Sequence, residues 1–281
     1  MSNQYRPQSF SILPPVVKNL LIINGLFFLA MISLDKVYHI DLSNFLGLHY
    51  FSSEMFKPYQ FITYMFMHAD LNHIFFNMFA LWMFGAAIEN QWGGKRFLFY
   101  YFFTGIGAAI LHYGIMYFEL KPTLDAIDLL ISKPSTEAIQ AFLSSNNFRV
   151  TSIEIQDLTN VFINKYNSTL GMNQQNEALQ LSVNFLSEYK TMFLNGPNVV
   201  GASGAVFGLL LAFGMLFPNS VIYIYFLIPL KAKYFVIVYG LAELYFGVTR
   251  TNSGVAHYAH LGGMLFGFIL IMYWKYNRKL Y

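Results

Sequence analysis

The feature that most constrains this chain is a series of apolar stretches, each about as long as a membrane-spanning helix. A helix needs roughly 17 to 25 mostly apolar residues to cross the hydrocarbon core of a bilayer. Six stretches meet or approach this requirement: residues 17–34, 60–88, 97–118, 201–217, 232–248 and 256–274. The segment between the fourth and fifth stretches is too short and interrupted to span, so we interpret it as a connection at the membrane interface. We therefore expect an all-α membrane protein with six transmembrane helices.

The overall composition agrees with this class and excludes several kinds of chemistry. Only 11% of the 281 residues are charged, against about a quarter in an ordinary soluble domain. The chain contains no cysteine, which excludes a disulfide framework, thiol catalysis and a cysteine-based metal site. The first apolar stretch lacks the small-residue cleavage pattern of a signal peptide, so we interpret it as a retained first span.

The basic residues are distributed unevenly among the segments between the stretches. With six spans both termini lie on one side, and the segments expected there contain nine Lys or Arg residues and one acidic residue, Glu89. The opposite side has mixed charge, since residues 119–198 contain eight acidic and five basic residues. Basic residues mark the cytoplasmic side of a membrane protein. We therefore expect cytoplasmic termini, with loops 35–59, 119–198 and 249–255 outside, in the inner membrane of a bacterium.

Residues 119–198 differ from the rest of the chain because they are polar and too long for an ordinary connection. The segment 151–154 (TSIE) has the pattern of a capping box, and residues 173–194 have the pattern of an amphipathic helix that ends at Asn-Gly-Pro. We predict a mostly helical insert on the outer membrane surface, between the third and fourth spans. The resulting domains are tails 1–16 and 276–281, spans 1–3 at 17–118, the insert at 119–198 and spans 4–6 at 199–275.

Strongly polar side chains inside a bilayer are functional candidates because burying them in hydrocarbon is unfavourable. In the second stretch, His73 and Asn77 are four residues apart and so share one face of a helix. His68 lies near the outer end of the same stretch. By residue type alone, the more common role of such groups is to hydrogen-bond between neighbouring helices.

Ser203 lies in a glycine-rich segment, residues 201–208 (GASGAVFG). Gly204 and Gly208 form a GxxxG pattern that lets another helix approach closely, and packing is the usual meaning of this pattern. The position of Ser203 favours a further role, because the polar insert ends just before it and places it in the first turn of a helix. First-turn N–H groups have no partner within the helix and can stabilise an oxyanion beside the serine.

Two histidines, His257 and His260, stand at the start of the last stretch. Gly263 and Gly267 follow His260 at intervals of three and seven residues, so they lie on its helical face. This glycine face is expected to pack closely against the glycine face of the fourth stretch. Such packing would bring His260 within hydrogen-bond reach of Ser203. His257 lies nearer the outer end, and we interpret it as a loop-facing or packing residue.

Nucleophilic catalysis requires a hydroxyl, a base and donors for the developing oxyanion. Ser203 and His260 supply the hydroxyl and the base. The last stretch contains no acidic residue to orient His260; Glu243 belongs to the fifth stretch and Asp70 to the start of the second. We therefore expect a Ser–His dyad and not a triad, with Phe207 placed one turn after the serine, where it can stack on the imidazole.

These motifs resemble those of the rhomboid intramembrane serine proteases. The family pattern G-x-S-G corresponds to residues 201–204, A-H-x-x-G-x-x-x-G in the last span to residues 259–267, and H-x-x-x-N in the second span to His73 and Asn77. The resemblance covers 17–118 and 199–275, but not the insert. It selects His260 over His257, and it implies that His73, Asn77 and the Ser203 backbone N–H bind the oxyanion. The supporting residues that it implies are Gly201, Gly204, Phe207, Gly263 and Gly267.

The resemblance implies a serine endopeptidase that cuts membrane proteins in or beside their transmembrane segments. It implies no cofactor, no metal ion and no nucleic-acid partner; the partners are transmembrane protein substrates and the lipid bilayer. The chain departs from the family at two places. Tyr59-Gln60 stands where many members have Trp-Arg in the first outer loop, and Phe207 stands where some members have tyrosine.

Two other classes remain open. A rhomboid-like protein that binds membrane proteins without cleaving them would typically lack the nucleophile or the base, whereas this chain has both Ser203 and His260. A transporter or channel that uses intramembrane histidines as a relay would be expected to have discontinuous helices or inverted repeats. The sequence contains one short span and no repeat, so it favours the protease.

Overall fold

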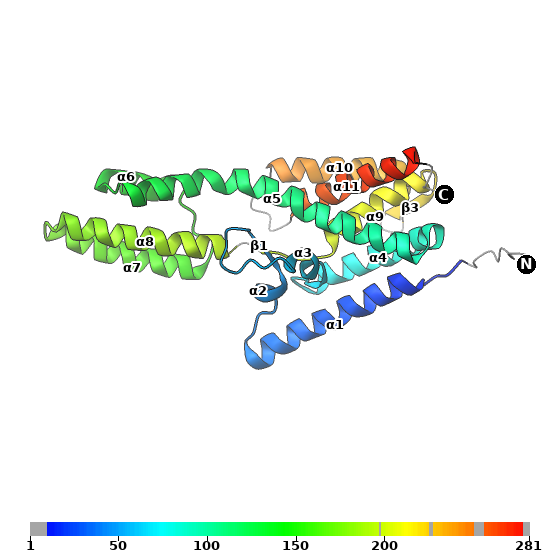
Figure 1. Ribbon diagram of the computed structural model, residues 1–281, viewed down its shortest axis with the longest axis horizontal. Coiled ribbons are helices and arrows are strands. Elements are labelled where there is room, and N and C mark those ends of the chain that lie inside the picture. The colour runs from blue at the N-terminus through cyan, green and yellow to red at the C-terminus, as the bar shows by residue number, and fades with distance from the viewer. Residues whose placement is uncertain (1–9, 197, 225–226, 250–255, 278–281) are drawn as a thin grey trace, which may run out of the picture. The chain divides into compact units, whose positions relative to one another are not determined.

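The computed structural model describes residues 10–196, 198–224, 227–249 and 256–277, and these ranges are mostly helical (Figure 1). The ends of both expected tails, Pro197 and most of the loop 249–255 lie outside the described residues. The chain divides into two compact units. We call Met1–Leu48, Pro58–His112 and Val199–Tyr281 the bundle unit, and we call His49–Lys57 and Tyr113–Asn198 the insert unit.

Long helices make up the bundle unit. They are α1 (Pro15–Tyr38), α4 (Leu71–Trp92), the first half of α5 (Gly94–Ser132), α9 (Ser203–Leu216), α10 (Ala232–Thr249) and α11 (His257–Tyr276). Helix α9 is the centre of this packing, because it contacts α11, α4 and α10, while α1 packs against α4. The residues that the sequence singled out for chemistry therefore lie on helices that are direct neighbours.

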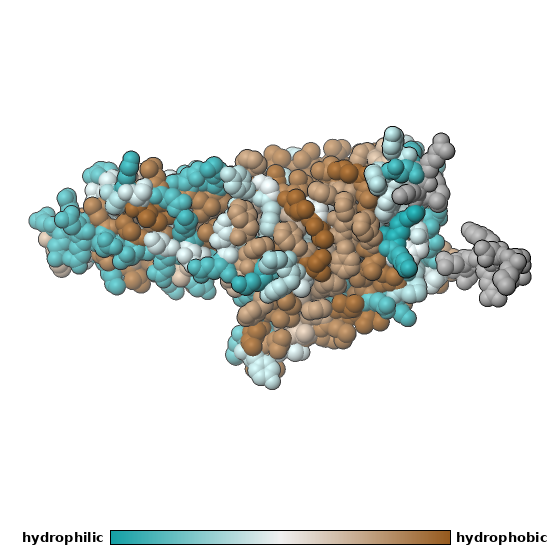
Figure 2. Space-filling model, in the orientation of Figure 1, coloured by the Kyte–Doolittle hydropathy of each residue, from teal (hydrophilic) through white to brown (hydrophobic). Residues whose placement is uncertain are grey.

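Apolar side chains fill the interior of the bundle unit and also cover much of its surface. Leu26 on α1, Phe76 on α4 and Leu241 on α10 are 61%, 66% and 61% exposed, and one apolar face is visible in Figure 2. By length and composition, α1, α4 and α5 can each cross a membrane, and α9 is a shorter apolar helix. Helices that satisfy their own backbone hydrogen bonds and expose apolar side chains are what a lipid environment requires.

The second apolar stretch is not one continuous helix, so the prediction of a span over 60–88 was wrong in its first part. The stretch divides into α3 (Gln60–Thr63), the 3-10 helix η1 (Tyr64–Phe66) and α4. The break occurs because Asp70 caps α4: its carboxylate accepts a hydrogen bond of 2.9 Å from the backbone N–H of His73.

Helix α5 does not end at residue 118, where the apolar stretch ends, but continues to Ser132. It contains Pro122, which lacks the N–H that would bond to the carbonyl of the preceding turn. Helix formation therefore extends beyond the apolar segment that made the span recognisable in the sequence.

The interfacial connection predicted between the fourth and fifth stretches is an antiparallel hairpin. Strands β3 (Val221–Ile224) and β4 (Ile228–Lys231) pair with Val221 opposite Lys231 and Ile224 opposite Ile228. Its position at a membrane interface stays a prediction. The other short elements in the described part of the chain are α2 (Ser43–Leu46) and the paired strands β1 (Leu48–His49) and β2 (Asn198–Val199).

The insert unit is helical, with the second half of α5 joined by α6 (Thr136–Leu143), α7 (Ile153–Gly171) and α8 (Gln175–Asn195). It has its own apolar core, in which the rings of Phe162 and Phe185 stack at 4.1 Å. Helix α8 matches the amphipathic helix that the sequence predicts at 173–194. The location of the insert on the outer membrane surface stays a prediction.

The cap of α7 differs by one residue from the capping box that the segment 151–154 suggests. The N-cap is Ser152, whose hydroxyl accepts a hydrogen bond of 3.3 Å from the N–H of Ile155. The carboxyl of Glu154 accepts hydrogen bonds from the hydroxyl of Ser152 and from the backbone N–H of Glu154 itself. These bonds hold the pKa of this carboxyl below its ordinary value.

Candidate active site

Ser203 is the first residue of α9, as expected from its position directly after the insert. The chain enters this helix through Gly201, which has a φ of +120°, a conformation that glycine adopts without steric strain. The N–H of Gly201 donates a 2.9 Å hydrogen bond to the carbonyl of Tyr64. A Cβ at this position would lie 2.6 Å from Nε2 of His73 and 3.7 Å from Oγ of Ser203. Gly201 thus leaves space beside the serine that a larger residue would occupy.

Close packing of α9 on α11 depends on glycine. A Cβ on Gly263 would overlap the carbonyl oxygen of Gly204, so the two backbones are in direct contact. The second pair of glycines, further along the two helices, does not meet in the same way, because Gly208 and Gly267 both pack against Thr104 of α5. The predicted glycine contact between the two helices is therefore present at the level of His260, and α5 fills the space further along.

The side chains of Ser203 and His260 are hydrogen-bonded. Nε2 of His260 lies 2.9 Å from Oγ of Ser203, within the reach that the helix packing predicts. The ring of Phe207 stacks on the imidazole with centroids 4.1 Å apart and an interplanar angle of 5°, also as expected. His260 is buried and Ser203 is half-buried.

Glu243 contacts both histidines of α11, which the sequence analysis did not predict. Its Oε2 lies 2.9 Å from Nδ1 of His260 and 2.7 Å from Nδ1 of His257. The expectation that no carboxylate lies beside His260 was wrong, because it considered the last stretch and not the helix that packs beside it. His257 is buried at 8% exposure and its ring contacts Phe246, so of the two roles expected for it, loop-facing or packing, the structure fits packing. The signal that was missed is that Glu243 is the single acidic residue in the stretch 232–248.

His73 and Asn77 lie on α4 and present hydrogen-bond donors. The backbone N–H of Ala69 donates to Nδ1 of His73 at 3.3 Å. A neutral His73 therefore has its proton on Nε2, the atom that faces Gly201. Asn77 is buried, and within the described ranges its amide nitrogen has no hydrogen-bond partner. Both groups can donate to a ligand atom that carries negative charge.

The segment before α4 is held by contacts of Tyr59 and Gln60, which form one of the two places at which the chain departs from the family pattern. Gln60 is fully buried, and its amide nitrogen donates a 3.2 Å hydrogen bond to the carbonyl of Phe45. The hydroxyl of Tyr59 lies 3.3 Å from the same carbonyl, and the hydroxyl of Thr63 donates to the carbonyl of Leu46 at 2.7 Å. These contacts attach α2 to α3.

Three potential metal ligands lie close together in the site. One nitrogen or oxygen atom from each of Glu243, His257 and His260 lies within 4.8 Å of the other two. Such a set has the chemistry of a zinc site. However, the distances of 2.7 Å and 2.9 Å between these atoms are those of ordinary hydrogen bonds. Hydrogen bonding is therefore sufficient to explain why the three side chains meet.

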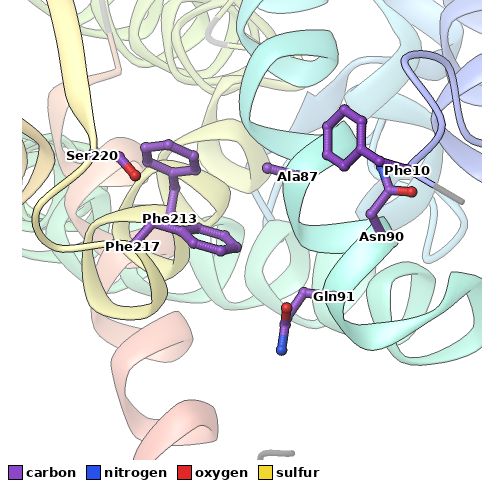
Figure 3. A pocket seen from close by; sticks show the side chains of 7 residues that line it. All are labelled: Phe10, Ala87, Asn90, Gln91, Phe213, Phe217 and Ser220. Atoms are coloured by element: carbon purple, nitrogen blue, oxygen red, sulfur yellow. The ribbon is translucent and has the colours of Figure 1, made fainter. Parts of the chain in front are cut away.

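A cavity of about 310 Å³ is lined by Phe213 and Phe217, at the end of α9 opposite to Ser203. Figure 3 shows the side chains that line it. None of the candidate residues lines this cavity. Its wall includes Asn90, whose side-chain amide exchanges two hydrogen bonds with the backbone of Ser11. The lining residues are Phe10, Ala87, Asn90, Gln91, Phe213, Phe217 and Ser220. The candidate active site is thus a separate location from the cavity.

The fold and the site define a class: a helical protein with an apolar exterior and a hydrogen-bonded serine–histidine pair at the start of a helix. Comparison with known families identifies it further, because the Rhomboid domain model matches residues 55–119 and 176–277, more than half of the chain. The chain belongs to the rhomboid family and is an integral membrane protein. Residues 120–175, most of the insert unit, lie outside the match.

A similar protein is rhomboid-like protein 11, chloroplastic, from Arabidopsis thaliana. It is 31% identical over 103 residues, which cover 33% of this chain and 34% of that protein. The chain thus spans about a third of the length of this curated relative.

Proposed function

We propose that this protein is an intramembrane serine endopeptidase in which Ser203 is the nucleophile and His260 is the general base. The observation that supports this proposal best is the 2.9 Å contact between Nε2 of His260 and Oγ of Ser203 at the N-terminus of α9. A serine needs such a base because its hydroxyl is a weak nucleophile at its ordinary pKa. The N-terminus of the helix adds free N–H groups beside the reacting oxygen.

Acylation follows from this arrangement. Nε2 of His260 accepts the hydroxyl proton while Oγ of Ser203 forms a bond to the carbonyl carbon of a peptide. The carbonyl oxygen becomes an oxyanion that accepts hydrogen bonds from the Ser203 N–H, from Nε2–H of His73 and from the amide of Asn77. The C–N bond then breaks, and the imidazolium transfers its proton to the leaving amine nitrogen.

Deacylation repeats the same proton transfers with water in place of the serine hydroxyl. His260 accepts a proton from water as the water oxygen attacks the ester carbonyl of the acyl-enzyme. When the second tetrahedral intermediate collapses, the ester bond breaks and Oγ of Ser203 recovers its proton from the imidazolium. Stacking on Phe207 keeps the imidazole plane fixed through both half-reactions.

The proposed membrane arrangement has six spans formed by α1, α4, α5, α9, α10 and α11. The termini are cytoplasmic and the active site opens toward the outer face, in the inner membrane of a bacterium. The substrates are membrane proteins that are cut in or beside a transmembrane segment. Because a helix hides its carbonyl groups in internal hydrogen bonds, good substrates have small or helix-destabilising residues near the cut.

A membrane-protein-binding role without catalysis is the alternative. Family membership alone does not imply proteolysis, and the similar plant protein is named only as rhomboid-like. The hydrogen-bonded Ser203–His260 pair favours the protease over this alternative.

Labelling with a fluorophosphonate probe tests the proposal, because such probes phosphonylate an activated serine. The full chain in detergent micelles should be labelled, whereas folded Ser203→Ala and His260→Ala variants should not be. Ser182→Ala is a matched control, since this serine is buried and hydrogen-bonded but lies in the insert unit; it should be labelled like the wild type. A folded wild type that resists labelling would support the binding protein. Labelling that persists in Ser203→Ala would exclude Ser203 as the nucleophile.

A further inference from the structure

The proposed dyad leaves Glu243 without a role, although its position is unusual. This carboxylate is 6% exposed in the middle of α10, and the residues before and after it, from Leu241 to Tyr245, are otherwise apolar. A carboxylate in such surroundings is unfavourable unless other groups hydrogen-bond to it. The groups that do so are both histidines of α11, and one of them is His260.

The contacts form a continuous chain from the serine to the second histidine. Oγ of Ser203 contacts Nε2 of His260, Nδ1 of His260 contacts Oε2 of Glu243, and the same oxygen contacts Nδ1 of His257. An ionised carboxylate only accepts hydrogen bonds, so each Nδ1 must carry the proton that it donates. A neutral His260 then has its lone pair on Nε2, facing the serine hydroxyl. This is the tautomer that a general base requires.

Phe207 alone does not fix this orientation. Stacking at an interplanar angle of 5° holds the plane of the imidazole. Rotation of the ring by 180° about its bond to Cβ preserves that plane, but it exchanges nitrogen for carbon at the position next to Ser203. Phe207 can stack on either orientation, whereas the hydrogen bond to Glu243 exists in only one of them.

We propose that Glu243 is a positioning residue that orients His260 through Nδ1, so that the catalytic apparatus is a Ser203–His260–Glu243 chain and not a two-residue dyad. This inference rests on the proposed protease function. When His260 accepts the serine proton, the carboxylate also stabilises the imidazolium, as the aspartate does in the Ser-His-Asp arrangement of soluble serine proteases. His257 donates to the same oxygen and holds the carboxylate in place.

The rate of fluorophosphonate labelling tests this proposal, because it reports activation of Ser203 without a known substrate. The maximal labelling rate and the half-saturating probe concentration are measured separately on the full chain in micelles, together with thermal stability. Glu243→Gln should reduce the maximal rate by about 10- to 100-fold, which is the effect of losing a charge-assisted hydrogen bond. The half-saturating concentration should stay within about twofold, because Glu243 does not touch the probe.

Two further variants separate positioning from a structural role. Glu243→Asp keeps the charge and should recover part of the lost rate. His257→Phe keeps the aromatic contact with Phe246 and should reduce the rate less than Glu243→Gln does, since it loosens the carboxylate without removing it. Glu89→Gln is the matched control: Glu89 is also a buried glutamate with two hydrogen bonds, to the N–H groups of Val16 and Val17. It should alter thermal stability and leave the labelling rate within about twofold of the wild type.

The outcomes distinguish this inference from the proposed function. If the wild type is not labelled, the protease proposal fails, and this inference fails with it. If the wild type is labelled, Ser203→Ala is not, and folded Glu243→Gln reacts at the wild-type rate, only the positioning role is excluded. If Glu243→Gln does not fold, Glu243→Leu, which also removes the carboxylate, takes its place, and a wild-type labelling rate in that variant would overturn the proposal.

Discussion

At the scale of single residues, the two histidines of the site differ in which ring nitrogen carries the proton. The group that contacts Nδ1 determines this in each case. Nδ1 of His73 accepts a hydrogen bond from the N–H of Ala69, which leaves Nε2 as a donor. Nδ1 of His260 contacts the carboxylate of Glu243, which leaves Nε2 as an acceptor. In the proposed mechanism, two chemically identical rings therefore act as a donor to an oxyanion and as a base for a hydroxyl.

The proposed role of Asn77 as an oxyanion donor can be tested directly. The amide nitrogen of Asn77 is buried and has no partner among the described residues, so it is free to donate when an oxyanion forms. Asn77→Ala should lower kcat for a transmembrane substrate by about 10²- to 10³-fold with little change in KM, which is the effect of losing one oxyanion donor. Asn24→Ala is the control, because Asn24 is a buried asparagine whose amide nitrogen donates to the carbonyl of Leu20 on its own helix, α1. A rise in KM without a change in kcat would contradict the assignment.

The contacts that the sequence predicted follow from residue spacing within a helix and from the glycine faces of α9 and α11. Ser203 and Phe207 are one turn apart on α9, and the glycine after His260 lies on the same face of α11, so their contacts follow from helical geometry. Glu243 and His257 were missed because their hydrogen bonds join α10 to α11. Glycine patterns indicated the faces of α9 and α11 that meet, whereas the spacing around Glu243 does not indicate which helix its side chain faces.

At the scale of secondary-structure elements, the contact between α9 and α11 sets the geometry of the site. Gly263 and Gly204 let the two backbones touch, and this contact determines how closely His260 approaches Ser203. The sequence predicted the contact from the glycine pattern. It did not predict where α4 begins or where α5 ends, because a capping aspartate and helix formation beyond the apolar segment set those boundaries.

Gly263→Ala tests the importance of this helix contact. The added methyl group would overlap the carbonyl of Gly204, so the helices must separate. Overpacking of this kind should destabilise the protein by about 1–3 kcal/mol, and labelling of Ser203 should slow because the contact with His260 lengthens. Gly25→Ala is the control, since a Cβ at Gly25 meets nothing within 4 Å; it should retain both stability and labelling. Unchanged labelling in Gly263→Ala would show that the site does not depend on this packing.

At the scale of the whole molecule, the chain combines two units that bury apolar residues in separate cores. Both units are recognisable in the sequence, because apolar stretches distinguish the bundle unit and a polar composition distinguishes the insert unit. The sequence did not predict that residues 49–57 belong with the insert unit. Tyr50 joins the core of that unit, and no local pattern around Tyr50 indicates a partner that is far away in the sequence.

Separate cores predict that the insert unit can be destabilised without loss of the active site. Phe185→Ala removes the ring that stacks on Phe162 and should cost about 3–5 kcal/mol within the insert unit. Amide hydrogen exchange should accelerate in α7 and α8, while fluorophosphonate labelling of Ser203 stays within about twofold of the wild type. Val161→Ala, at a position that is 53% exposed, should change neither quantity. If labelling is lost together with protection of α7 and α8, the two units do not fold independently, and folding of the insert is a condition for an active bundle.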